Sequence, residues 1–276
     1  MRNPTKSSWT RNRSSDCAPG WDHECIMQTW FTADLHLGHT NVIQYSGRPF
    51  ADADAMNSAL IDGWNEVVAD DDVVWVLGDF ALGKLADTLP LVRELRGRKI
   101  LLAGNHDRCW YGHGRRSEGW TQKYLDAGFD EIHQGELTMR VGDVEALMCH
   151  FPYYGDSHDH DRYVEHRPAD RGEWLLHGHV HERWTQRDRM INVGVDATGY
   201  RPISVSEIAR LIAVETRGDR ISSRRAPQRE YGGNQSNQRA GLQGVTEARG
   251  ERIANLVGEL LAAGPHSRGH RQSGAG

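Results

Sequence analysis

Five short apolar runs of this chain end in the same way, in a polar cluster that contains Asp, Asn or His. The clusters are Asp34-Leu35-His36 after residues 29–33, Gly78-Asp79 after 73–77, Gly104-Asn105-His106-Asp107 after 99–103, His150 after 144–149, and Gly178-His179-Val180-His181 after 174–177. Open α/β sheets bind ligands beyond the carboxyl ends of their strands. We therefore expect the five clusters to meet at one functional site.

The spacing of apolar residues predicts an α/β fold for the central part of the chain. Strands are predicted at 29–33, 73–77, 99–103, 174–176 and 190–195, and a hairpin at 137–141 and 144–149 around the turn Gly142-Asp143. Helices are predicted at 52–68, at 85–95 with an interruption near Pro90, and at 120–127. For residues 206–214 the pattern does not decide between helix and strand.

The residue types in the five clusters are those of a metal site. Residues two apart in an extended chain project to one side, so Asp34 and His36 could hold one cation together. His179 and His181 have the same spacing. Carboxylate oxygen and neutral imidazole suit Mn, Fe, Zn or Ni. Each motif alone occurs often by chance, but five of them at strand ends indicate metal-dependent chemistry.

In this order, the motifs D-x-H, G-D, G-N-H-D, H and G-H-x-H resemble the signature of the calcineurin-like metallophosphoesterases, over residues 29 to about 214. The resemblance implies an α/β fold, namely a four-layer β-sandwich of two mixed sheets flanked by helices. It also implies a hydrolase that cleaves a phosphoester with water. Two divalent metal ions are expected, with Mn as the first expectation and Fe, Zn or Ni as alternatives.

The resemblance also assigns roles to single residues. Asp34, His36 and His181 resemble the ligands of one metal, and Asn105, His150 and His179 those of the second. Asp79 resembles the carboxylate that bridges both. His106 resembles a catalytic histidine that stabilises the transition state or protonates the leaving group, and Asp107 is expected to orient its imidazole.

Two residues close to the first cluster are candidates for substrate binding. They are His39 in H-L-G-H and Arg48 in S-G-R-P-F, and a solvent-exposed side chain is the alternative for each. His177 is expected in the core or in support of the ligands. Three more histidines lie in a loop rich in Asp and Arg, which predicts a surface insertion or a lid. They are His158, His160 and His166.

The second motif favours a diester substrate. In the protein phosphatases of this family that motif continues into Asp-Arg-Gly, whereas here Gly78-Asp79 is followed by Phe80-Ala81-Leu82. No arginine therefore stands where those enzymes hold a phosphomonoester dianion. We expect a phosphodiesterase whose substrate is derived from a nucleotide. The alternatives are a nuclease or a phosphomonoesterase of the same superfamily, or a non-catalytic scaffold stabilised by metals.

Composition sets limits on partners and location. The net charge of -5 over 276 residues argues against stable binding to nucleic acid. No apolar run approaches the roughly 18 residues of a membrane span, so no membrane is expected as a partner. The four cysteines form no C-x-x-C pair, which is typical of free thiols and predicts a cytoplasmic location.

The chain changes character at both ends. Residues 1–26 are polar and irregular, which predicts a disordered leader before a metallophosphoesterase domain at 27–216. A linker is predicted at 217–244, an amphipathic helix at 245–263 and a disordered tail at 264–276. The helix has an apolar stripe that must face either the catalytic domain or another chain, so self-association through it is one of two expectations.

Overall fold

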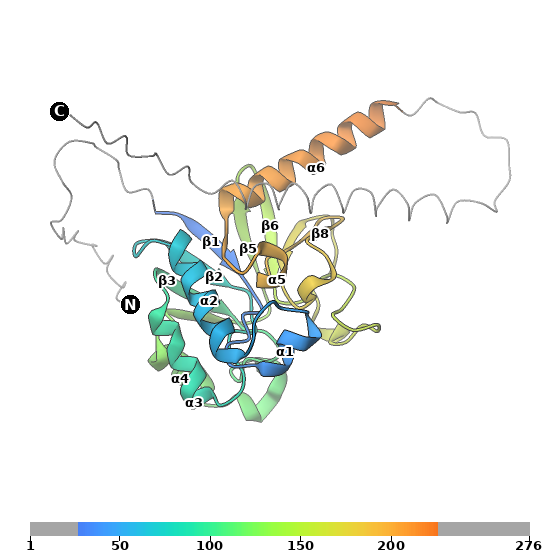
Figure 1. Ribbon diagram of the computed structural model, residues 1–276. Helices are drawn as coiled ribbons and strands as arrows, with labels where there is room; N and C mark the ends of the chain where they lie inside the picture. Colours follow the sequence, from blue (N-terminus) through green and yellow to red (C-terminus); the bar gives the residue numbers. More distant parts are fainter. Residues whose placement is uncertain (1–26, 226–276) are drawn as a thin grey trace, which may run out of the picture.

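A computed structural model describes residues 27–225 of the chain, with the side chains of residues 27–216. The fold has two five-stranded sheets (Figure 1). The first has the order β10-β1-β2-β3-β4. Its strands are β1 (Thr29–Thr32), β2 (Val73–Val76), β3 (Arg98–Leu102), β4 (Glu131–His133) and β10 (Ile203–Ser204). Strands β1 to β4 run parallel, and β10 pairs antiparallel with β1, so the sheet is mixed.

The second sheet has the order β5-β6-β7-β9-β8. Its strands are β5 (Glu136–Val141), β6 (Val144–Cys149), β7 (Trp174–His177), β8 (Gln186–Arg187) and β9 (Met190–Asn192). The central strands β6, β7 and β9 are parallel, whereas β5 and β8 pair antiparallel at the two edges. Two mixed sheets are what the resemblance implies, and the predicted fold class is confirmed.

Buried side chains from both sheets form a shared core. Phe31, Leu77 and Leu102 come from the first sheet, and Met148 and Leu176 from the second. Helix α6 (Val205–Arg225) joins this core through Ile208, Leu211 and Ile212. All eight are at most 4% exposed, so the two sheets and α6 exclude water together.

Helices cover the first sheet on its other side (Figure 1). Helix α2 (Ala53–Val67) buries Met56, Leu60 and Trp64, the face that the apolar spacing predicts, and Asp52 caps it by accepting from the N–H of Ala55 at 2.8 Å. Helix α3 (Leu85–Thr88) passes into the 3-10 helix η1 (Leu89–Glu94) just before Pro90, as predicted. The other helical elements are α1 (Thr40–Tyr45), α4 (Trp120–Ala127), α5 (Val195–Thr198), η2 (Tyr111–Ser117), η3 (Val164–His166) and η4 (His181–Arg183). No helix within residues 27–225 is long and apolar enough to cross a membrane.

The last helix of the domain extends into the segment that was predicted to be a linker. Residues 206–214, left undecided, belong to α6, and this helix continues to Arg225 through the first nine residues of the predicted linker. A polar composition argues against burial but not against helix, because extending a formed helix is easy once packing has nucleated it. The predictions for 1–26, 226–244, 245–263 and 264–276 lie outside the described residues.

Candidate metal centre

The five polar clusters meet where the two sheets come together. The segments after β1 and β2 are joined by hydrogen bonds from the N–H of Asp34 to the carbonyl of Gly78 and from the N–H of His36 to the carbonyl of Asp79, both 3.0 Å long. A parallel bridge between Ala33 and Gly194 joins the first sheet to the second. All seven predicted ligands lie in one cluster, and six of them are at most 4% exposed. The expected convergence is therefore observed.

Backbone conformation, rather than strand alternation, aims these ligands. Eight non-glycine residues of the described chain have positive φ, and five of them are predicted ligands. They are Asp34, His36, Asp79, His179 and His181, with φ between 51° and 72°. The prediction that Asp34 and His36 project together from an extended chain is thus wrong in its reason, although the two side chains do converge. A non-glycine residue in this region is strained and needs its surroundings to hold it there.

Two glycines allow the ligands to approach so closely. A Cβ atom on Gly78, whose φ is +90°, would lie 2.4 Å from Nδ1 of His150. A Cβ atom on Gly178 would lie 2.5 Å from Oδ2 of Asp34. Both distances are far below contact, so the glycines before Asp79 and His179 are required for the shape of the centre.

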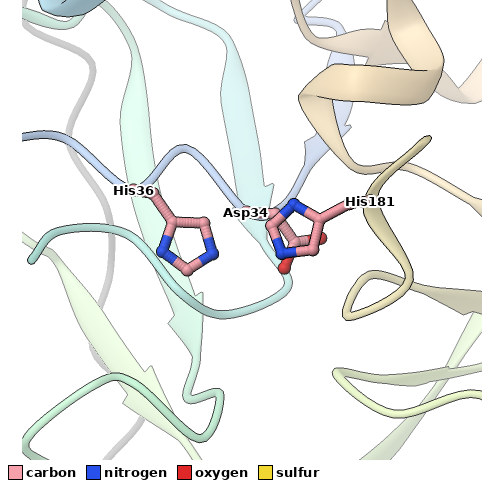
Figure 2. A group of neighbouring side chains, drawn as sticks. All are labelled: Asp34, His36 and His181. Carbon is pink, nitrogen blue, oxygen red and sulfur yellow. The ribbon is translucent and has the colours of Figure 1, made fainter. Parts of the chain in front are cut away.

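The first group of ligands consists of Asp34, His36 and His181. Their ligand atoms lie within 4.8 Å of one another, and Figure 2 shows Asp34 and His36 on one segment and His181 on another, with their side chains brought together. Both ring nitrogens of His36 are buried and have no hydrogen-bond partner. A buried polar atom without a partner is costly in a native protein, so this imidazole fits the role of a metal ligand.

The second group surrounds Asp79. Its Oδ2 atom lies 3.6 Å from Nε2 of His36 and 3.4 Å from Nε2 of His150, so one carboxylate oxygen faces both groups. Oδ1 of Asn105 lies 3.0 Å from the same nitrogen of His150. The rings of His150 and His179 are 5.2 Å apart. Ligand atoms of Asp34, Asp79 and His150 also lie within 4.8 Å of one another, close enough to hold one metal ion.

Hydrogen bonds fix which nitrogen each imidazole presents to the centre. His150 directs Nδ1 to the carbonyl of Leu77 at 2.8 Å and leaves Nε2 for the centre. Nδ1 of His181 lies 3.0 Å from Asp196, and Nε2 of His179 lies 3.0 Å from Asp156. Such outer partners orient ligating imidazoles and set their tautomers.

Asp156 and Asp196 are functional residues that the sequence analysis missed. Asp196 follows β9 with no recognisable motif, and Asp156 lies at the start of the loop that was predicted to be a surface insertion. Asp156 is in fact 4% exposed and bonded to Arg162 and Arg167, so this part of the loop is structural. The prediction holds only for the exposed residues of the loop, among them His158 and His160. His166 is half-buried against Trp110.

Arg48 is not a solvent-exposed or substrate-binding residue. Its guanidinium is buried and donates two hydrogen bonds of 2.8 Å to Asp196. It also donates to the backbone carbonyls of Asp34 and Leu35. The arginine therefore holds the first ligand segment and, through Asp196, His181. The expectation that Arg48 contacts the substrate is corrected, because no N–H group of its guanidinium remains directed to solvent.

The expected partnership of His106 and Asp107 is also corrected. The Asp107 carboxylate accepts from the N–H groups of Asp79, Phe80 and Gly104 at 2.8–3.1 Å, and it forms no hydrogen bond or ion pair with the His106 imidazole. Asp107 thus fixes the backbone of the central ligand Asp79. The His106 side chain is 43% exposed, and its Nε2 lies 4.0 Å from Oδ2 of Asp79.

The two remaining histidines differ in their access to the centre. The ring of His39 is half-buried and lies 5.5 Å from that of His36, beside the first group. His177 is fully buried, with Nδ1 2.7 Å from the carbonyl of Gly178, and the prediction of a core residue is confirmed.

The electrostatics of the cluster favour a cation. Burial lowers the pKa of His36 well below its usual range and that of His179 to about 4, so both imidazoles are neutral at pH 7, as ligands must be. Burial alone would lower the pKa of His150, but Asp79 and Asp34 raise it to about 9. The two carboxylates therefore strongly favour positive charge at this point.

The two mixed sheets and the buried carboxylate, amide and imidazole groups beyond their strands define a metal-binding α/β protein. The chain belongs to the calcineurin-like phosphoesterase superfamily, whose domain model matches residues 27–212. Members of this superfamily are metal-dependent phosphoester hydrolases, and the family predicted from the five motifs is confirmed.

Individual relatives extend the similarity along the same domain. The chain is 34% identical to the Gene 66 protein of Mycobacterium phage L5 over 205 residues, which cover 68% of this chain and 95% of the phage protein. It is 27% identical to an uncharacterized protein of Methanocaldococcus jannaschii over 196 residues, or 68% and 92% of the two chains. The solved structure of a protein of unknown function from Aquifex aeolicus matches with a TM-score of 0.52 and 26% identity, over 67% of this chain and 99% of the other.

Proposed function

We propose that this protein is a phosphodiesterase with a binuclear metal site. The observation that carries the proposal is the position of Asp79, whose Oδ2 atom faces His36 on one side and His150 on the other. A carboxylate so placed can bridge two cations. When bound, two divalent cations would activate a water molecule and hold the phosphoryl oxygens.

The ligand sets that the family resemblance implies are compatible with this geometry. Asp34, His36 and His181 would hold one ion, with Asp196 and Arg48 keeping His181 in place. Asn105, His150 and His179 would hold the other, with Asp156 behind His179. The donors are oxygen and imidazole nitrogen without thiolate, a set that suits Mn and also Fe, Zn or Ni.

His106 is proposed as the catalytic residue. Its imidazole is the exposed one beside the centre, 5.3 Å from the ring of His36, and its backbone N–H donates to Oδ1 of Asp79 at 2.8 Å. The backbone is therefore fixed relative to the bridging carboxylate, while the side chain can reach the substrate. From this position it can donate a proton to the departing alkoxide or stabilise charge on the phosphoryl oxygens.

Two arginines beside the centre are already neutralised by aspartates, which supports a diester. Arg48 is held by Asp196 and Arg167 by Asp156, so neither is free to bind the second negative charge of a monoester. The segment after Asp79, where the protein phosphatases continue into Asp-Arg-Gly, reads Phe80-Ala81-Leu82-Gly83-Lys84 and contains no arginine. A diester, with a single charge, needs less cationic help.

The test compares bis(4-nitrophenyl) phosphate with 4-nitrophenyl phosphate on the Mn²⁺-loaded full chain. We expect Mn²⁺-dependent release of nitrophenol, a higher kcat/KM for the diester, and loss of turnover with EDTA that added Mn²⁺ restores. A folded, metal-loaded protein with no turnover of either ester would refute the enzyme. A higher kcat/KM for the monoester would refute the diesterase assignment alone.

A further inference from the structure

A pocket of about 230 Å³ adjoins the metal centre on the side of His106. Two segments form it, the one that follows Asp79 and the one that continues from Asn105 into η2. The lining residues are Ala81, Leu82, Gly83, Leu85, Asn105, His106, Arg108 and His113. Because Asn105 and His106 belong to the pocket and to the proposed site, a substrate at the metals could extend into it.

The polar side of this pocket carries an unneutralised positive charge. Arg48, Arg162 and Arg167 near the centre are all paired with aspartates. Arg108, by contrast, is exposed and forms no ion pair with any residue in 27–216. No acidic side chain lines the pocket. An arginine left free at the wall of a concave site is suited to bind a phosphate or carboxylate.

His113 adds a hydrogen-bonding group beside this charge. Its imidazole is half-buried and stacks edge-on against Trp110, with ring centroids 5.3 Å apart. An imidazole N–H can donate a hydrogen bond to an anion while Arg108 supplies the charge.

The opposite wall is apolar, and the volume is small. Ala81, Leu82 and Leu85 form this wall. Sites for drug-sized ligands span about 300–1,000 Å³, so about 230 Å³ suits a fragment the size of one phosphorylated sugar. The apolar wall would pack against the carbon skeleton, and Arg108 would bind the charged end.

We propose that this pocket binds a second phosphate, carried on the alcohol that leaves when the diester is cleaved. The inference rests on the proposed diesterase function and narrows its substrates to diesters with an additional phosphate group on the leaving side. It places the leaving group beside His106, the residue positioned to protonate it. Water attacks phosphorus and releases a proton to solvent, the P–O bond to the leaving alcohol breaks, and that oxygen takes a proton from His106.

The test uses the Mn²⁺-loaded full chain and a thymidine dinucleotide, either unmodified or phosphorylated at its 5′ or its 3′ end. We expect one of the two phosphorylated forms to have a kcat/KM about ten-fold above that of the unmodified dinucleotide, because one charge-assisted contact contributes on that scale. Arg108→Gln should abolish this preference and change turnover of bis(4-nitrophenyl) phosphate by less than about two-fold. Arg115→Gln, which changes an exposed arginine of η2 outside the pocket, should keep the preference.

Three outcomes would overturn the subsite. In the first, the wild-type protein cleaves all dinucleotides with equal kcat/KM. In the second, the preference for a phosphorylated dinucleotide survives in Arg108→Gln. In the third, Arg108→Gln lowers kcat/KM equally for every substrate, including 4-nitrophenyl phosphate. If the wild type cleaves no ester, the proposed function is refuted, and a binding measurement then tests the phosphate subsite by itself. Metal-free protein should then bind ribose 5-phosphate about ten-fold more tightly than its Arg108→Gln variant by titration calorimetry, and equal affinities would refute the subsite.

Discussion

Asp79 and His106 lie 4.0 Å apart but occupy different environments. The Asp79 carboxylate is buried, and the imidazoles of His150 and His106 hold its pKa well below the usual range even though burial alone would raise it. The His106 side chain is 43% exposed and contacts the centre only from its edge. The first residue is therefore suited to hold cations and the second to meet the substrate.

These environments predict different losses on substitution. Asp79→Asn should reduce the content of both metals and lower kcat by several orders of magnitude, because one charge is removed from the shared position. His106→Ala should keep its metals and lower kcat by about 10² to 10⁴, the usual contribution of acid–base assistance. Metal content by mass spectrometry, measured beside kcat, separates the two effects. Loss of metal from His106→Ala to the level of Asp79→Asn would contradict the assigned roles.

Helices and strands with a periodic apolar pattern could be predicted from the sequence. Very short strands, and contacts between side chains far apart in the sequence, could not. Helix α2 was predicted because Met56, Leu60 and Trp64 recur at its buried face. Strands β4, β8 and β10 have only two or three residues each, too few to show a period. The seven proposed ligands could be selected from the sequence because they follow strand ends and match the motifs of the family. The burial of Arg48 was missed because its compensating partner, Asp196, lies 148 residues away in sequence.

Helix α6 predicts what the segment beyond it contributes. Among the residues of α6 whose side chains are described, 205–216, the last buried one is Ile212, and Val214 is 47% exposed. A chain ending at Arg225 should therefore keep its melting temperature and its turnover per metal site, whereas Leu211→Ala in the full chain should lose about 2–5 kcal/mol of stability. Thermal unfolding measures both changes.

Light scattering on the same truncated chain tests the helix predicted at 245–263. A lower mass with unchanged turnover would support self-association through that helix. A lower melting temperature with unchanged mass would show that the removed segment packs on the catalytic domain, against our expectation.

The metal centre joins the two sheets, so metal binding and global stability should be linked. The ligands come from loops after β1, β2 and β3 of one sheet and after β6 and β7 of the other. A ligand that binds only the folded state at a thousand times its Kd adds about 4 kcal/mol, which corresponds to roughly 10 °C in a domain of this size.

We therefore expect EDTA to lower the melting temperature of the full chain by about 10 °C, and Mn²⁺ to restore it. Asp79→Asn is the control, since its melting temperature should respond much less to either addition. Equal melting temperatures for the wild type with EDTA and with Mn²⁺ would contradict a centre that connects the sheets through its ions.

The left-handed backbone at five ligand positions limits how metal preference could be redesigned. Asn and Asp tolerate this conformation better than other side chains with a Cβ atom, and β-branched residues hardly adopt it. Only a few amino acids can therefore replace Asp34 and Asp79 in a laboratory evolution experiment. Asn105 and His150 have negative φ and carry no such restriction. A library aimed at altered metal selectivity should diversify those two positions first.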